Sequence, residues 1–362
     1  MTATPFDAFR EPDRRDWDTD PDGTVRMAVV GLGNYARSVS LPAIDESDYC
    51  DLSVAVSGTE GSRIETVREY DAVGLTYEEY ADGAAADEYD AVYVATPNRL
   101  HLPHVETAAE HGKSVICEKP LEATADRARR AVATCEEAGV TLMTAYRMQT
   151  DPVVRRLREF LRAGGIGEPI RLFGNFSFDV LGGSRGPDQW RIDEELAGGG
   201  ALMDVGVYPL NTARFLLEVD PVAVWGTTRT SGPFAGVDEH VEFGVEFPDA
   251  IGNFSASFSG HSNGELSILG TEGRLELRDA FDVAADRRLV VETDDGTIEL
   301  DGFGRDETVE EFDYFAHCLL TDERPEPDGR DGLVDVETSM AIYRAAEKGE
   351  RMAVEVDRSS SI

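Results

Sequence analysis

Lys119, Asp204 and Tyr208 are residues whose types and positions single them out as candidates for chemistry. Lys119 lies in the tripeptide Glu118-Lys119-Pro120, and it is one of three lysines in the 362-residue chain. Tyr208 follows Asp204 by four residues, which places both on one face of a helix. The scarcity of lysine and the place of Lys119 at a strand end raise Lys119 above an ordinary solvated charge. Tyr208 could equally be a core residue of an apolar helix.

A glycine turn early in the chain indicates a bound dinucleotide. The sequence Gly31-Leu32-Gly33-Asn34-Tyr35-Ala36 directly follows the apolar run 25–30. The first glycine permits a tight turn, the second lets the backbone approach a pyrophosphate, and the small Ala36 permits close packing of helix on strand. A helix that begins at this turn attracts the phosphate charge. The residues expected to contact the dinucleotide here are Gly31, Gly33, Asn34 and Tyr35.

The second apolar run ends at residues that favour NADP over NAD. An acidic residue at this position would bind the ribose 2′-hydroxyl, whereas a small residue with a nearby arginine suits a 2′-phosphate. The chain has Ser57 and Gly58 here, followed by Arg63, which can supply the positive charge. Glu60 lies between them and either turns outward or opposes the phosphate.

Two further strand ends carry polar residues, at Thr96-Pro97-Asn98 and at Glu118-Lys119. Ligands of doubly wound sheets bind at the carboxyl ends of the strands, so these residues are expected at the cofactor site. His101 follows closely and is expected to line the cofactor cleft. His101 and His104 are three residues apart, but the sequence offers no evident third ligand, so no metal site is expected.

The elements that must position these residues follow from the hydrophobic pattern. Short apolar runs alternate with helical stretches up to about residue 147, which predicts a parallel, doubly wound sheet. Later segments such as 241–247 and 275–278 alternate apolar and polar residues, which indicates a sheet with one solvated face and antiparallel pairing. We therefore expect an N-terminal arm over 1–24, a dinucleotide-binding domain over 25–147 and a substrate-binding and oligomerisation domain over 148–362. The predicted strands are 25–30, 52–56, 91–95, 114–117 and 141–144, and the predicted helices include 102–111, 125–138, 152–163, 308–320 and 331–347.

The chain is strongly acidic. It contains 71 Asp and Glu against 34 Lys and Arg, a formal net charge of −37. Such a surface repels nucleic acid and anionic membranes. Acids dispersed along the whole chain, with so little lysine, resemble proteins of salt-accumulating organisms, which predicts activity in molar salt. The sequence has no apolar run as long as a membrane span and no export signal. Its four cysteines form no C-x-x-C pair, so a reducing cytoplasm is expected.

An ordered set of these motifs resembles one enzyme family. Gly31-x-Gly33-x-x-Ala36, Ala95-Thr96-Pro97-Asn98, Glu118-Lys119-Pro120, Ala145-Tyr146-Arg147 and Asp204-x-Gly206-x-Tyr208-Pro209 occur in this order. Together they resemble the glucose–fructose oxidoreductase, inositol dehydrogenase and MocA family over roughly residues 25–350. The likeness is greatest to its glucose–fructose oxidoreductase branch, and within it to haloarchaeal NADP-dependent D-xylose 1-dehydrogenases.

The resemblance implies a Rossmann domain followed by an α+β domain with a large, mainly antiparallel open sheet. In the family that sheet commonly packs against a second subunit, which implies a homodimer or homotetramer. The resemblance gives Lys119 contacts with both nicotinamide and sugar, makes Tyr208 the proton-transfer residue, and gives Asp204 a supporting role. Further candidates for holding nicotinamide or sugar are Arg147, Trp190, Arg191 and Asn211, of which Asn211 is expected to contact the sugar.

The implied activity is that of an NADP-dependent aldose 1-dehydrogenase that converts D-xylose to D-xylonolactone. Tyr208 would remove the C1 hydroxyl proton while C1 gives a hydride to the nicotinamide. Two alternatives stay open. One is an oxidoreductase of the glucose–fructose type, which keeps NADP bound and cycles it between two sugars. The other is a non-catalytic NADP-binding sugar regulator, against which the presence of both Lys119 and Tyr208 speaks.

Overall fold

The chain forms two compact units that are interleaved in the sequence. The computed structural model describes residues 6, 9–17, 20–182, 186–283, 286–302 and 306–355. The parallel-sheet unit comprises Arg15–Thr150 and Arg305–Leu333, and the open-sheet unit comprises Met1–Arg14, Asp151–Gly304 and Val334–Ile362. A late segment thus joins the first unit and the chain's start joins the second, and the predicted boundaries at 24/25 and 147/148 stay predictions.

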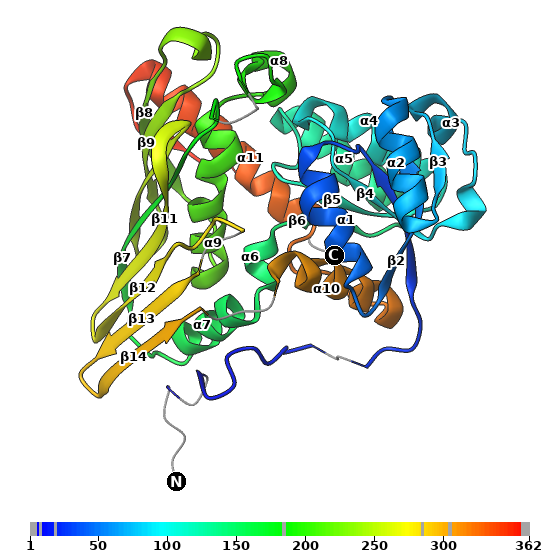
Figure 1. The fold of residues 1–362 in the computed structure, drawn as a ribbon. Coiled ribbons are helices and arrows are strands. Elements are labelled where there is room, and N and C mark those ends of the chain that lie inside the picture. The colour runs from blue at the N-terminus through cyan, green and yellow to red at the C-terminus, as the bar shows by residue number, and fades with distance from the viewer. Residues whose placement is uncertain are drawn as a thin grey trace. The chain divides into compact units, whose positions relative to one another are not determined.

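The parallel-sheet unit is built on six strands in the order β3-β2-β1-β4-β5-β6, all paired in parallel. The strand order reverses between β1 and β4, so the carboxyl ends of the central strands meet at one edge. Helix α1 packs beside α10, and α4 packs beside α5 (Figure 1). The strands are β1 (Val25–Val30), β2 (Cys50–Val56), β3 (Val73–Leu75), β4 (Ala91–Val94), β5 (Ser114–Glu118) and β6 (Leu142–Ala145). The helices are α1 (Leu41–Asp45), α2 (Glu60–Tyr70), α3 (Tyr77–Ala81), α4 (His101–Glu110), α5 (Ala125–Ala138), α6 (Arg147–Thr150) and α10 (Glu307–Thr321), with short turns η2 (Ala36–Ser40), η3 (Ala86–Glu88) and η4 (Asn98–Leu100).

This arrangement confirms the predicted doubly wound sheet. Its strands read as apolar runs because they are buried on both faces; every residue of β4 is buried. The sequence pattern missed β3, which has only three residues and one buried position. Helix α10 was predicted within the second domain, but its Phe312 and Phe315 are buried in one core with Val29 of β1.

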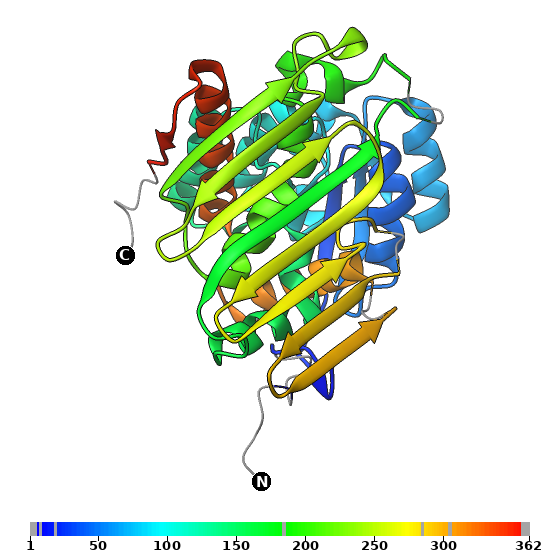
Figure 2. The ribbon, with the colours of Figure 1, turned by 90° about the vertical axis from the view of Figure 1, so that its left-hand side faces the viewer.

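The open-sheet unit contains a nine-stranded sheet in the order β14-β13-β12-β11-β7-β10-β9-β8-β15. Only the pair of β7 and β10 is parallel, which confirms the predicted mainly antiparallel sheet. Figure 2 shows the face of this sheet that carries no described helix. The strands are β7 (Pro169–Asp179), β8 (Ala223–Arg229), β9 (His240–Glu246), β10 (Ile251–Ser257), β11 (Ser259–Gly270), β12 (Gly273–Arg278), β13 (Arg288–Thr293), β14 (Gly296–Asp301) and β15 (Met352–Ala353). The helical segments are α7 (Pro152–Arg162), η5 (Trp190–Ile192), α8 (Glu194–Ala197), η6 (Leu202–Gly206), α9 (Val207–Leu217), η7 (Gly232–Phe234) and α11 (Gly329–Lys348), which begins in the parallel-sheet unit.

The inner face of this sheet carries the π-helical turn η6 and helix α9. Gly174 of β7 allows this close packing, because a Cβ there would lie 2.8 Å from Cβ of Pro209. Gly206 lies against Ala256 of β10 in the same way, at 3.3 Å. The sheet therefore fixes the depth of the segment that holds Asp204 and Tyr208.

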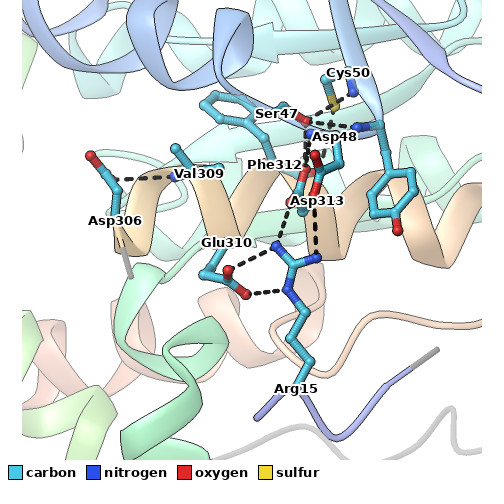
Figure 3. Close-up of polar contacts among 10 residues, drawn as sticks. Arg15, Ser47, Asp48, Cys50, Asp306, Val309, Glu310, Phe312 and Asp313 are labelled. Carbon is cyan, nitrogen blue, oxygen red and sulfur yellow. Dashed lines mark hydrogen bonds and ion pairs between the residues drawn. The ribbon is translucent and has the colours of Figure 1, made fainter. Parts of the chain in front are cut away.

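Part of the N-terminal arm is anchored on α10 of the parallel-sheet unit. The Arg15 guanidinium donates hydrogen bonds to both carboxylate oxygens of Glu310, at 2.7 and 2.8 Å, and to Asp313 at 2.5 Å (Figure 3). Asp313 also accepts hydrogen bonds from the Ser47 hydroxyl and the Asp48 amide. Since the Arg15 side chain is only 5% exposed, loss of one partner would cost about 3–5 kcal/mol.

Candidate active site

The glycine turn after β1 has the geometry that a dinucleotide requires. Gly31 has φ of +104°, and a Cβ there would lie 2.5 Å from the carbonyl oxygen of Ala95. A Cβ on Gly33 would meet no atom within 4 Å, so the backbone there is open to an approaching group. Ala36 is buried and begins the π-helical turn η2, which continues into α1. The turn therefore leaves space beside Gly33 for the predicted pyrophosphate; Asn34 is exposed and Tyr35 is half-buried.

The end of β2 forms a short loop that is ordered by its own hydrogen bonds. The Ser57 hydroxyl oxygen accepts the Thr59 amide at 3.1 Å, and Arg63 Nη1 donates to the Ser57 carbonyl at 2.7 Å. Arg63 lies in the first turn of α2 and is half-buried, while Gly58 and Glu60 are exposed. The structure thus brings together the serine and the arginine predicted to select the cofactor.

The end of β4 carries a buried polar atom without a protein partner. The Thr96 hydroxyl accepts and donates no hydrogen bond among the described residues, although Thr96 is only 7% exposed. A buried hydroxyl without a partner is costly, which fits a ligand at this edge of the sheet. Pro97 and the buried Asn98 follow it.

His101 connects the two loops that follow β4 and β5. Its ring nitrogens lie 2.8 Å from the Thr96 carbonyl oxygen and 3.1 Å from that of Leu121. The side chain is fully buried, so it links the two loops beside the expected cofactor cleft and is not exposed in it. His104 instead stacks on Tyr77, and burial lowers its pKa to about 4.

Lys119 follows a glutamate that is held by a chain of hydroxyl groups. Ser40 lies 2.9 Å from the Tyr93 hydroxyl, which donates to Glu118 at 2.6 Å. The other Glu118 oxygen accepts the backbone amide of Lys119 at 3.1 Å. Burial and the nearby Glu118 carboxylate raise the pKa of Tyr93 well above its usual range, so the phenol stays a donor. This chain fixes the backbone from which the half-buried Lys119 side chain extends.

Behind these residues lies a buried charged group on α6 and α10. Arg147 is 3% exposed and forms an ion pair with Glu307. The neighbouring Glu311 is also buried, and burial and Glu118 raise its pKa well above the usual range, although Arg147 lowers it. Sequence reasoning selected Arg147 but missed Glu311, because nothing in its local sequence shows that α10 joins the first unit.

In the open-sheet unit the structure brings Asp204 together with two other predicted residues. Arg191 Nε donates to Asp204 Oδ2 at 3.0 Å, and the Arg191 guanidinium lies 4.7 Å from the ring centroid of Trp190. Asp204 lies in η6 and is 8% exposed. The guanidinium therefore fixes the orientation of the Asp204 carboxylate through a charge-assisted hydrogen bond.

Tyr208, in the first turn of α9, is half-buried against two phenylalanine rings. The ring of Phe176 meets it edge-on at a centroid distance of 5.3 Å, and Phe281 lies 5.8 Å away. Asn211 is 1% exposed, and its amide donates to Asp335 of α11 at 2.7 Å. The aromatic partners come from β7 and from the segment after β12, which no local motif around Tyr208 reveals.

The predicted site residues thus form two groups, one in each unit. In the part of the chain that is described, no three His, Cys, Asp or Glu side chains are arranged to hold a metal ion. None of its helices is long and apolar enough to cross a membrane. The group in the parallel-sheet unit comprises Gly31, Gly33, Asn34, Tyr35, Ser57, Gly58, Arg63, Thr96, Pro97, Asn98, His101, Glu118, Lys119 and Arg147, and the group in the open-sheet unit comprises Trp190, Arg191, Asp204, Tyr208 and Asn211.

Comparison with known proteins identifies the class to which this fold and site belong. Residues 25–146 match the oxidoreductase family with an NAD-binding Rossmann fold, and residues 154–276 match the GFO/IDH/MocA C-terminal domain. The chain belongs to the GFO/IDH/MocA oxidoreductase family, which confirms the predicted family.

Individual relatives within that family are sugar oxidoreductases. The chain is 47% identical to D-xylose 1-dehydrogenase [NADP(+)] of Haloarcula marismortui, over 92% of this chain and 95% of the relative. It is 34% identical to D-xylose 1-dehydrogenase (NADP(+)) 2 of Haloferax volcanii, over 91% and 99%. Among solved structures, aldose-aldose oxidoreductase from Caulobacter crescentus, complexed with glycerol, matches with a TM-score of 0.85 and 31% identity over 91% and 99%.

Proposed function

We propose that this chain is an NADP-dependent aldose 1-dehydrogenase that oxidises D-xylose to D-xylonolactone. The observation that carries this proposal is the 47% identity to an enzyme of that name along nearly the whole length of both chains. The acidic composition, with a net charge of −37, matches the salt-accumulating source of both named relatives and supports activity in molar salt.

The residues of the parallel-sheet unit fit NADP. Gly33 leaves space for the pyrophosphate. The buried Thr96 hydroxyl has no hydrogen-bond partner among the described residues, so it is available to a ligand. Ser57 and Arg63 at the end of β2 suit a 2′-phosphate, because a hydroxyl and a guanidinium are both donors. Bound NADP supplies the hydride acceptor.

In the proposed chemistry Tyr208 acts as the base. Tyr208 removes the C1 hydroxyl proton of the pyranose as C1 loses its hydride, which leaves the C1–O double bond of the lactone. The Lys119 ammonium stabilises the phenolate, and Asp204, paired with Arg191, accepts hydrogen bonds from sugar hydroxyls. The pairing of Lys119 with Tyr208 joins residues of the two units and is part of the proposal.

A substrate panel tests the proposed reaction. Purified protein in molar KCl is mixed with single aldoses or polyols and with NADP or NAD, and reduced nicotinamide is followed by its absorbance. We expect turnover with D-xylose and NADP and a loss of turnover in dilute buffer. If the protein binds NADP but turns over none of the sugars, the result would favour the non-catalytic NADP-binding sugar regulator instead.

A second candidate is favoured by one observation, the likeness to aldose-aldose oxidoreductase. An enzyme of that kind would keep its cofactor and pass the hydride from one sugar to another. Desalting distinguishes the two: a dehydrogenase releases NADP and needs it added, whereas the alternative retains nicotinamide absorbance and converts two sugars without added NADP.

The uncovered sheet face supports a homodimer or homotetramer. Phe173 of β7 and Ile251 of β10 are 44% and 48% exposed on neighbouring strands, and exposed apolar patches mark interfaces. Phe173→Asp should reduce the mass measured by light scattering, whereas Val73→Asp, an exposed apolar site on β3 of the other unit, should not. A cytoplasmic location is also part of the proposal, supported by four buried cysteines that form no disulfide.

A further inference from the structure

The helical segment that carries Asp204 and Tyr208 begins without a capping side chain of its own. The π-helical turn η6 starts at Leu202 after three glycines, and its N-cap residue, Ala201, has no side-chain hydrogen bond. The first amide groups of a helix have no partner within the helix and need one from elsewhere. A side chain far away in the sequence supplies it.

Asp238, which lies before β9, caps this segment from outside. One Asp238 carboxylate oxygen accepts the Gly200 amide at 2.6 Å, and the other accepts the Leu202 amide at 2.8 Å. The Asp238 carbonyl accepts the amide between them, from Ala201, at 2.9 Å. Three consecutive amides are thus bound by one residue. The approach requires glycine at 200, because a Cβ there would lie 2.0 Å from the Asp238 carbonyl oxygen.

Tyr343 of α11 holds the capping carboxylate in place. Its hydroxyl donates to Asp238 at 2.6 Å and accepts the Gly200 amide at 3.2 Å. Gly199 leaves room for it, since a Cβ there would lie 2.2 Å from the Tyr343 hydroxyl oxygen. Asp238 is 5% exposed, so water contributes little to its hydrogen bonding. Gly199 and Gly200 thus fit around these two side chains.

The Asp238 cap lies close to the proposed site residues because only a few residues separate the capped amides from Asp204 and Tyr208. Asp204 donates its amide to the Gly200 carbonyl at 3.1 Å, one turn after the capped residue. Tyr208 follows one further turn on, in α9. A shift or rotation of the first turn is therefore passed to both side chains, and displacement of a catalytic group by about 1 Å can cost 100-fold in rate.

We propose that Asp238, held by Tyr343, is a positioning residue that fixes the helical segment bearing Asp204 and Tyr208. The inference rests on the proposed role of Tyr208. It assigns a function in turnover to a buried acid that is not among the predicted site residues.

The test compares two buried capping aspartates of the same unit. Asp238→Asn keeps the shape but replaces one acceptor oxygen with a donor, which leaves an amide without a partner. The matched control is Asp151→Asn. Asp151 caps α7 through the Val154 amide at 2.9 Å, pairs with Arg287 at 2.7 Å and is fully buried, but α7 carries no proposed site residue.

We expect Asp238→Asn to lower kcat about 10- to 100-fold, with the KM for NADP and the Kd for NADPH from fluorescence titration unchanged. Asp151→Asn should lower Tm by a comparable amount and keep kcat within about twofold. Equal kcat per folded molecule in the two variants, measured well below both Tm values, would overturn the inference.

Tyr343→Phe provides a second variant if Asp238→Asn does not fold. It removes a single hydroxyl, so kcat should fall about 3- to 10-fold, again without a change in NADPH binding; an unchanged kcat would contradict the proposal. Tyr208→Phe distinguishes failure of the proposed base from failure of the positioning role. If Tyr208→Phe keeps normal turnover, the proposed base is wrong. If Tyr208→Phe loses turnover while Asp238→Asn and Tyr343→Phe keep it, only the positioning role is rejected.

Discussion

The two groups of site residues differ in what holds them. In the parallel-sheet unit most site residues lie at or just after the end of a strand. Several have partners near in sequence or on a neighbouring strand, as with Ser57 and Thr59 or Glu118 and Tyr93. In the open-sheet unit Tyr208 depends on residues far along the chain, such as Phe176, Phe281 and Asp238.

This difference predicts that substitutions in the two groups affect different quantities, cofactor binding in one and turnover in the other. A regular parallel sheet places its strand ends together whatever the side chains are, so the backbone positions the residues predicted to bind the cofactor. A helix resting on the inner face of a sheet is positioned by packing and capping instead. Substitutions in the parallel-sheet group should therefore weaken cofactor binding only where the substituted residue itself contacts the cofactor. Substitutions in the open-sheet group should lower kcat, even when the substituted residue lies far from Tyr208.

The largest expected effect tests the centre of the second group. Tyr208→Phe removes the proposed base but keeps the ring packed between Phe176 and Phe281. Turnover should fall about 100- to 10,000-fold, the usual contribution of a general base. Fluorescence titration should show NADPH binding within about twofold of the unmodified protein, and near-normal turnover would reject the assignment.

A pair of glycine substitutions tests the first group. Gly31→Ala forces a side chain into a backbone with φ of +104° and against the Ala95 carbonyl, so stability should fall by about 1–3 kcal/mol along with NADP binding. Gly33→Ala meets open space and should leave stability within about 0.5 kcal/mol while it weakens NADP binding. Urea unfolding and NADPH titration of both variants measure this. Equal stability losses would show that the space above Gly33 is not open.

Cofactor preference is the next smaller effect. Ser57→Asp places a carboxylate where the 2′-phosphate is expected, while it can still accept the Thr59 amide. Loss of one charge-assisted hydrogen bond, about 1.5–3 kcal/mol, corresponds to a roughly 10- to 100-fold lower kcat/KM with NADP, and activity with NAD should rise. Ser53→Asp, in the same strand but away from its carboxyl end, adds the same charge and should leave the preference unchanged.

The parallel-sheet unit was also easier to predict from the sequence than the open-sheet unit. The runs that form β1, β2, β4, β5 and β6 were visible because buried strands are continuously apolar, and the glycine turn, Ser57 and Lys119 were visible because each follows such a run. The three-residue β3 gave no periodic signal. The mainly antiparallel sheet was predictable from alternation, but its strand order was not, since pairing between distant strands leaves no local trace.

The unpredicted site residues are all long-range partners. Asp238 lies 36 positions beyond Leu202, and Tyr343 lies 143 positions beyond Gly200, so no motif joins them. Glu311 belongs to α10, whose assignment to the parallel-sheet unit depends on the return of the chain to that unit after the open sheet. A short motif can reveal a residue's chemistry, but the partners that hold it become visible only in the fold.

The smallest expected effect concerns Glu311, which lies behind the strand ends and takes no part in the proposed chemistry. Its pKa is raised by burial and by Glu118, so the folded protein holds a proton that the unfolded chain releases above its ordinary pKa of about 4.3. The stability contributed by this proton is present below that value and is lost as the pH rises toward the folded pKa. Glu311→Gln needs no proton, so its stability relative to the unmodified protein should increase from pH 4.5 to 7.5, by about 1.4 kcal/mol for each pKa unit.

The neighbouring Glu310 offers a control of opposite sign. Glu310→Gln breaks the buried pair with Arg15, so it should destabilise the protein throughout the same pH range. Urea unfolding of both variants at constant molar KCl gives the comparison. A stability difference for Glu311→Gln that stays constant with pH would mean that Glu311 is ionised in the folded protein.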